Sequence, residues 1–188
     1  MALRLSAIGS LMTEHRLIER VIRDVQGQLD RFDADDSIDP VYVYTVVDFL
    51  RTYADRCHHG KEEDILFRDL EARPLASAHA EMMHALVTDH VWARGTTRAL
   101  IEATDRYAAG EREAAHEARA LMRALADFYP DHIEREDHGF FKPAVEYFTP
   151  DEREAMAEEF REFDRLLIHE RYQRLAEDLE SQHGCSAS

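Results

Sequence analysis

The sequence predicts an all-α protein, an antiparallel up-down four-helix bundle with an additional C-terminal helix. Glycine and proline are scarce, with 7 and 5 among 188 residues, which disfavours a turn-rich β protein. Apolar residues recur at intervals of three and four through most of the chain, as they do on one face of a helix. Breakers divide this pattern into five segments joined by short loops, which is typical of a bundle.

Caps and breakers bound the first three helical segments. The first covers about 5–32 and ends in an acidic stretch. The second covers about 40–72, because Asp39 suits the capping position and the proline after it suits the first helical turn. The third covers about 75–108 and stops before Gly110, which is typical of a C-terminal cap. These segments are long enough to be three rods of a bundle.

The fourth segment covers about 111–148 and contains Pro130, which predicts a kink there or a break into two helices. The fifth opens with a capping box, in which Thr149 is the cap and Glu152 follows three residues later.

We therefore expect a bundle domain at 1–148 containing an internal repeat of two hairpins. A C-terminal helix at 149–182 would pack on the bundle, and 183–188 would form a tail. The apolar side chains of that helix predict a cover for the bundle, a lid over its interior, or a homodimer surface.

Charge and cysteine usage exclude several classes of partner. The chain carries 39 acidic against 23 basic side chains, a formal net charge of -16, and no cluster of lysine and arginine. This disfavours nucleic acid and an anionic membrane surface. Two cysteines make no disulfide framework, no apolar run approaches the ~18 residues of a membrane span, and the N-terminus lacks a signal-peptide core. We expect a cytoplasmic protein.

Four of the 11 histidines lie on apolar stripes of four different segments, and two of these stripes add a glutamate one turn later. A single histidine on such a stripe is more often a hydrogen-bonded core residue than a metal ligand. Two buried glutamates favour the metal, because a buried carboxylate without a partner is costly and no lysine or arginine lies beside either of them on the stripe. The predicted metal ligands are His15, His58, Glu62, His90, His132 and Glu136.

The spacing of these residues repeats along the chain. His58 and Glu62 are separated as His132 and Glu136 are, and an acidic residue follows each glutamate. His15 precedes His58 by 43 residues, and His90 precedes His132 by 42. Two hairpins packed about an approximate two-fold axis would bring together two histidines per metal and two shared carboxylates. Imidazole and carboxylate ligands favour iron or manganese at a dinuclear site.

At these residues the chain resembles the hemerythrin-like, or HHE cation-binding, domains over about 8–145. The resemblance implies a hemerythrin-like bundle that holds two iron ions, bridged by two carboxylates and an oxo or hydroxo group, with manganese or zinc as alternative metals. Such centres bind dioxygen in the founding members, and relatives act on nitric oxide, peroxide or redox signals. The matching stretches are Glu14-His15-Arg16-Leu17-Ile18, Cys57-His58-His59-Gly60-Lys61-Glu62-Glu63-Asp64-Ile65-Leu66-Phe67, Asp89-His90 and His132-Ile133-Glu134-Arg135-Glu136-Asp137.

The chain departs from the oxygen carriers of this family, which have a fifth histidine one turn from another on the third helix. Leu86 and Arg94 occupy the positions one turn from His90, and neither His84 nor His79 suits the role. Two histidines per metal would leave a position free on both ions. This favours turnover or sensing over oxygen carriage.

Several residues near the predicted site have alternative interpretations. His59 and Glu63 repeat the ligand spacing, but their stripe is polar, so we expect it to face solvent. Tyr53 and Tyr129 suit the core better than a phenolate ligand. Cys57 suits a small buried position better than a redox-sensitive thiol.

The predicted function is a non-haem di-iron protein that binds O2, NO or H2O2 for sensing, storage or oxidative and nitrosative defence. A di-iron enzyme with peroxidase or catalase-like activity is one alternative, and a metal-free helical interaction module is another. A ferritin-like site would need Glu-x-x-His on two helices. The chain has this spacing at Glu81–His84 and Glu113–His116, but the second pair lies on a polar face, so we disfavour it.

Overall fold

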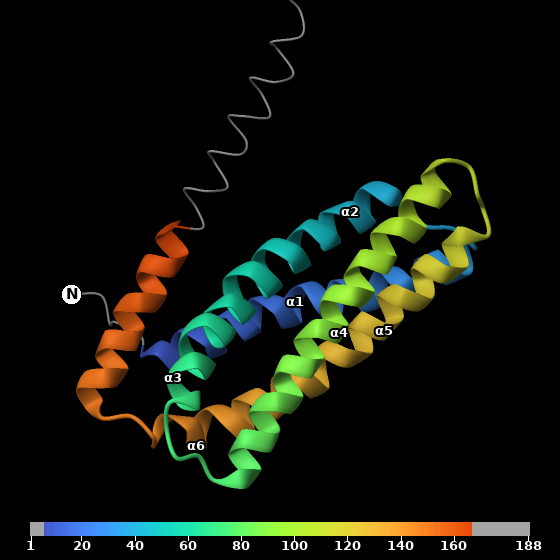
Figure 1. The fold of residues 1–188 in the computed structure, drawn as a ribbon. Helices are drawn as coiled ribbons and strands as arrows, with labels where there is room; N and C mark the ends of the chain where they lie inside the picture. Colours follow the sequence, from blue (N-terminus) through green and yellow to red (C-terminus); the bar gives the residue numbers. More distant parts are fainter. Residues whose placement is uncertain (1–5, 167–188) are drawn as a thin grey trace, which may run out of the picture.

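The computed structural model describes residues 6–166, and this part of the chain is helical with no strand (Figure 1). The all-α prediction is therefore confirmed. No helix in these residues is long and apolar enough to cross a membrane. In chain order the elements are α1 (Ala7–Ala34), α2 (Pro40–Phe49), η1 (Leu50–His59), η2 (Glu62–Phe67), α3 (Arg68–Glu71), α4 (Ser77–Ala108), α5 (Ala114–Glu134), η3 (Arg135–Phe140) and α6 (Phe141–Val145), followed by a helix at 150–166.

These elements form four long rods that lie side by side (Figure 1). The rods are α1, the run from α2 to α3, α4, and the run from α5 to α6. Neighbours in the bundle include α4 with α5, α1 with α5, and α2 with α4. The helix at 150–166 lies at the end of the bundle where α1 begins and α3 ends. The expected bundle with an additional helix is thus observed.

The predicted caps form the hydrogen bonds that helix termini need. The Asp39 carboxylate accepts from the backbone N–H of Val41 at 2.9 Å. At the last helix the Glu152 N–H donates to the Thr149 hydroxyl at 3.3 Å, and the Thr149 N–H donates to the Glu152 carboxylate at 2.7 Å. This reciprocal pair is a capping box. Gly110 has a φ of +106°, a backbone conformation that L side chains rarely adopt.

Three stretches of the second and fourth rods are wound as π-helix rather than α-helix. They are η1 and η2 in the second rod and η3 in the fourth. A π-helix has hydrogen bonds from residue i to i+5 and more residues per turn, and it is most frequent near functional sites. Spacing arguments based on 3.6 residues per turn therefore fail locally in these stretches.

Of the kink or break predicted at Pro130, the break does not occur. The α5 helix continues through Pro130 to Glu134, and the winding changes only at Arg135. Proline removes the N–H that would bond to the carbonyl four residues earlier. That carbonyl belongs to Ala126, and the side-chain amide of Gln26 donates to it at 3.3 Å from α1. A neighbouring helix thus replaces the missing hydrogen bond.

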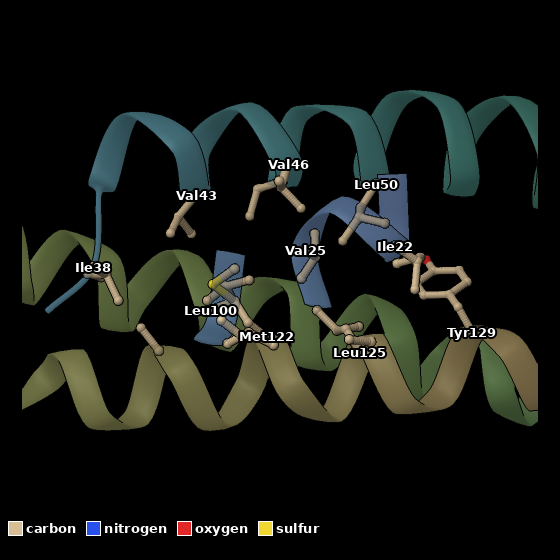
Figure 2. Close-up of a cluster of buried hydrophobic side chains, with 14 of the residues drawn as sticks. Ile22, Val25, Ile38, Val43, Val46, Leu50, Leu100, Met122, Leu125 and Tyr129 are labelled. Carbon is tan, nitrogen blue, oxygen red and sulfur yellow. The ribbon is translucent and has the colours of Figure 1, made fainter. Parts of the chain in front are cut away.

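The core is divided into two apolar clusters with a polar layer between them. In α1, Leu11 belongs to one cluster, Ile18 belongs to the other, and His15 lies between them along the chain. The fourth rod repeats this order, with His132 between Tyr129 and Phe140. Residues of the larger cluster shown in Figure 2 include Ile22, Val25, Val43, Leu100, Met122 and Leu125.

The helix at 150–166 contributes Met156, Ala157 and Phe160 to the smaller cluster, so this part of the expected C-terminal helix covers the bundle. The remainder, including His169, and the tail at 183–188 lie outside the described residues. The homodimer surface expected on this helix stays a prediction.

The contact between Gln26 and the carbonyl of Ala126 is testable by a double-mutant cycle. Gln26→Ala should lower the free energy of unfolding by about 1 kcal/mol, because it leaves a partly buried carbonyl without a donor. In a Pro130→Ala background the restored N–H supplies that donor, so Gln26→Ala should cost less there. Urea unfolding of the four proteins measures both costs, and equal costs in the two backgrounds would contradict this role of Gln26.

Candidate metal centre

The six residues predicted as metal ligands meet in the polar layer between the two apolar clusters. Each of their side chains is buried, with 1 % of its surface exposed or less. They come from all four rods: His15 from α1, His58 and Glu62 from the second rod, His90 from α4, and His132 and Glu136 from the fourth rod.

The Glu136 carboxylate lies between histidines of three rods. Its Oε2 atom is 3.1 Å from Nε2 of His15. Its Oε1 atom is 3.2 Å from Nε2 of His132 and 3.5 Å from Nε2 of His90. The two oxygens of one carboxylate therefore face different histidines.

The Glu62 carboxylate is arranged in the same way. Its Oε1 atom is 3.4 Å from Nε2 of His58, and its Oε2 atom is 3.5 Å from Nε2 of His90. Both carboxylates thus span the cluster, which is the position that a bridging ligand between two ions would need.

None of these facing atoms has a hydrogen-bond partner in the described part of the chain, and each is inaccessible to solvent. Buried polar atoms are nearly always satisfied, so a convergent group of unsatisfied atoms needs an explanation. Four imidazole nitrogens with lone pairs and four carboxylate oxygens are suitable donors for iron, manganese or zinc. The residues therefore fit a metal. The atoms are Nε2 of His15, His58, His90 and His132 and both side-chain oxygens of Glu62 and Glu136.

His59 also lies in this cluster, and the expectation that it faces solvent is wrong. Its side chain is 1 % exposed, and its ring stacks on that of His90 with 3.9 Å between centroids. A fifth histidine is thus present, supplied by the second rod and not by the third helix. The π winding of η1 explains the error, because more residues per turn allow the neighbours His58 and His59 both to face inward.

The donors separate into two groups, in each of which the ligand atoms lie within 4.8 Å of one another. One group holds three imidazoles and the other holds two imidazoles and both carboxylates. The groups are His59, His90 and His132, and His15, His58, Glu62 and Glu136. The histidine count is therefore unequal, whereas the sequence predicts two for each metal.

The other ring nitrogen of each predicted ligand histidine donates to a carboxylate. Fixing the proton at Nδ1 leaves the Nε2 lone pair directed into the cluster, as is usual for histidines that bind metals. The four bonds are His15 to Asp137 at 2.7 Å, His58 to Glu14 at 2.9 Å, His90 to Glu63 at 2.7 Å and His132 to Asp89 at 3.3 Å.

Each of these four outer carboxylates is in turn paired with a cation. Glu63 accepts from the Arg94 guanidinium at 2.6 Å. The remaining pairs are Asp137 with Arg16, Glu14 with Lys61, and Asp89 with Arg135. The cations neutralise the outer carboxylates and none of them contacts Glu62 or Glu136, so the two central carboxylates are left without a cationic side chain as partner.

The outer carboxylates follow the two-hairpin repeat. Glu14 of α1 bonds His58 of the next rod, and Asp89 of α4 bonds His132 of the rod after it. Glu63 and Asp137, the acidic residues that follow the two central glutamates, accept instead from histidines of the other hairpin. Glu63 accepts from His90, and Asp137 accepts from His15. Each acid therefore orients a histidine on a different rod from its own.

The electrostatics of the cluster favour positive charge. Burial lowers the pKa of His15, but the carboxylates of Asp137 and Glu136 outweigh it and raise that pKa to about 9. Burial also lowers the pKa of His90, but the carboxylates of Glu136 and Glu63 outweigh this effect and raise that pKa to about 10. Burial and the neighbouring Glu136 raise the pKa of Glu62. A carboxylate held this way binds a proton or a metal ion readily.

A fully buried lysine connects the cluster to the C-terminal helix. The Lys61 ammonium donates to Glu14 and, at 2.8 Å, to Asp164, and it lies 5.8 Å from the centre of the Phe160 ring. Cys57 also donates to Asp164, at 3.3 Å. Burial raises the pKa of this thiol to about 12, which favours the unreactive thiol form and not a redox-sensitive thiolate.

The two tyrosines near the cluster belong to the core. Tyr129 is buried in the larger apolar cluster, and Tyr53 packs against that cluster and stacks on Phe49. Burial raises the pKa of both phenols, to about 12 for Tyr53, so the phenolate form that binds a metal is disfavoured.

The remaining histidine motifs lie on the surface. His84, His116 and His138 are exposed, as are Glu81 and Glu113. The Glu-x-x-His spacings thus bring no ligands into the interior, which agrees with disfavouring a ferritin-like site.

In a comparison with protein-family models, the chain matches the hemerythrin HHE cation-binding domain over residues 6–144. No significant match was found among curated proteins or among solved structures. The matched region contains all four rods, apart from the last residue of α6, and every histidine and glutamate of the buried cluster. The chain belongs to the hemerythrin HHE cation-binding domain family.

Proposed function

We propose that the chain is a non-haem di-iron protein that binds O2, NO or H2O2 in sensing, storage or oxidative and nitrosative defence. The observation that carries the proposal is the group of eight buried, unpaired donor atoms between the two apolar clusters. Membership of a cation-binding family supports a metal as their partner. The mix of imidazole and carboxylate supports iron.

The two donor groups suggest how the ions are held. His59, His90 and His132 would hold one ion, and His15 and His58 would hold the other. Glu62 and Glu136 would be shared, because each presents its two oxygens to different histidines. Two iron ions in this place would supply redox-active positions for a small ligand.

The unequal number of imidazoles predicts where that ligand binds. The ion with three histidines has fewer free positions than the ion with two, and an open position is what a metal needs to take up a ligand. The side of His15 and His58 is therefore the binding side in this proposal.

The surrounding residues orient the ligands and limit their contact with water. The four outer carboxylates hold the histidine protons at Nδ1, so the Nε2 lone pairs face the ions. The two apolar clusters close the polar layer from both ends of the bundle. A dry interior strengthens every charge interaction within it.

Metal analysis of the aerobically purified protein tests the central claim. The protein should contain about two iron ions per chain and show near-ultraviolet charge-transfer absorption that changes when NO is added. His132→Ala should lose about one ion or more per chain, because it removes a donor from a closed set. His138→Ala, an exposed change on the same rod, should lose none. Zinc alone, or no metal, would contradict the proposal.

A second variant tests the fifth histidine. His59→Ala should reduce the metal content or weaken the affinity for one of the two ions, since one ion then keeps only two histidines. His84→Ala is the matched control, as that histidine is exposed. Two ions held with unchanged affinity in His59→Ala would show that His59 is a buried neighbour of the centre and not a ligand.

The outer carboxylates give a third prediction. Asp137→Asn should lower the metal affinity about 10–100-fold, because His15 loses the acceptor that fixes its tautomer and raises its basicity. Asp127→Asn makes the same chemical change at an exposed position and should leave the affinity unchanged. Competition with a coloured chelator measures both, and circular dichroism establishes that the helices are retained. Equal affinities in the two variants would refute an orienting role for Asp137.

A further inference from the structure

A cavity of about 290 Å³ lies between η1 and α4 and reaches the histidine cluster. Its volume corresponds to roughly ten water molecules of the liquid, far more than a diatomic ligand or peroxide occupies. A site of this size is closer to the pockets that hold small organic molecules. The cavity is therefore large enough for a molecule bigger than a diatomic ligand or peroxide.

The inner part of the cavity is buried and mostly apolar. His59 and Tyr129 line it and are 1 % and 2 % exposed, and Leu50 and Ala93 are buried beside them. Nδ1 of His59 is buried and has no hydrogen-bond partner. The cavity thus leads from the surface to an imidazole of the metal centre along an apolar wall.

The outer part of the cavity is cationic. Arg51 from η1 and Arg98 from α4 line it and are exposed, and neither forms an ion pair with a residue in the range 6–166. Two uncompensated guanidinium groups at one opening are unusual in a chain whose formal net charge is -16. They attract an anion, and a guanidinium matches a carboxylate with two parallel hydrogen bonds.

A third arginine in the cavity is already occupied. Arg94 donates to Asp55 at 2.6 Å and to Glu63 at 2.6 Å, and Glu63 is the acceptor for His90. Asp55 is the one carboxylate among the lining residues, against the three guanidinium groups of Arg51, Arg94 and Arg98, so it does not cancel the charge of Arg51 and Arg98. The positive charge of the opening stays available for a ligand.

We propose that this cavity binds an amphipathic carboxylate, with the carboxylate on Arg51 and Arg98 and an apolar body between Leu50, Ala93 and Tyr129. The inference deepens the proposed function, because it names the class of molecule that approaches His59. Its evidence is the cavity itself, so it does not require that the metal be iron.

Calorimetric titration of the purified protein with benzoate tests the proposal. Arg51→Gln combined with Arg98→Gln should weaken benzoate binding at least tenfold and leave the metal content unchanged. Arg20→Gln combined with Arg112→Gln makes the same change of charge at exposed positions outside the cavity and should have little effect. Benzoate binding that is absent, or equal in the two double variants, would overturn the proposal, and equality would indicate a direct bond to the metal instead.

A series of carboxylates tests the apolar part. From acetate to hexanoate the affinity should rise by up to about fourfold per methylene, as burial of each group contributes ~0.8 kcal/mol. Inorganic phosphate serves as the purely polar probe and should bind more weakly than hexanoate. A flat series, or phosphate that binds as tightly as hexanoate, would overturn the class of ligand.

Metal analysis of the same samples separates this inference from the proposed function. Protein without iron that still binds benzoate through Arg51 and Arg98 would refute the di-iron function and support the cavity. Iron-loaded protein that does not bind benzoate would refute the cavity proposal and support the di-iron function.

Discussion

The rest of the structure depends on one constraint, the burial of two carboxylates at the centre of a helical bundle. Glu62 and Glu136 have no exposed surface, and no lysine or arginine among residues 6–166 contacts either of them. Burying an ionised carboxylate is among the most costly events in folding unless a cation compensates it. Within residues 6–166 the compensating charge can come from protons on the surrounding imidazoles or from a metal ion that those imidazoles hold.

Charge alternates outward from this centre. Imidazoles surround the carboxylates, acidic side chains accept from the imidazoles, and arginine or lysine neutralises the acids. The cations satisfy the outer acids and the acids satisfy Nδ1 of the imidazoles, whereas the central carboxylates and the Nε2 atoms stay unpaired. The outermost cations reach solvent except for Lys61. That lysine is covered by Phe160, so the position of the helix at 150–166 and the orientation of Glu14 are physically connected.

Much of this arrangement can be predicted from the sequence, because most of it follows ordinary helical spacing. The intervals between apolar residues are sufficient to direct His15, His90 and His132 inward, and the capping box at Thr149 marks the start of the last helix. The hydrogen-bond partners of these residues on other helices could not be predicted in this way. Side chains of adjacent residues on a helix diverge, which excludes His15 as the partner of Glu14, but nothing in the sequence indicates that the partner is His58.

Two further features could not be predicted, because packing against other helices changes what the local sequence favours. Helical spacing of 3.6 places His59 on a polar face, and only the π geometry of η1 turns it inward. Pro130 suggests a break, but the side chain of Gln26 replaces the lost hydrogen bond from another helix. In both places the local rule is correct for an isolated helix and is overruled by the packed bundle.

The π winding also bears on how the chain reaches its native state. Long π stretches are rare because isolated helices prefer α geometry, so the windings of η1, η2 and η3 depend on contacts with the other rods. A peptide covering 40–71 alone has no such contacts and would keep the α register, with one of its two adjacent imidazoles turned outward. The complete donor set is therefore a property of the packed bundle and not of the second rod by itself.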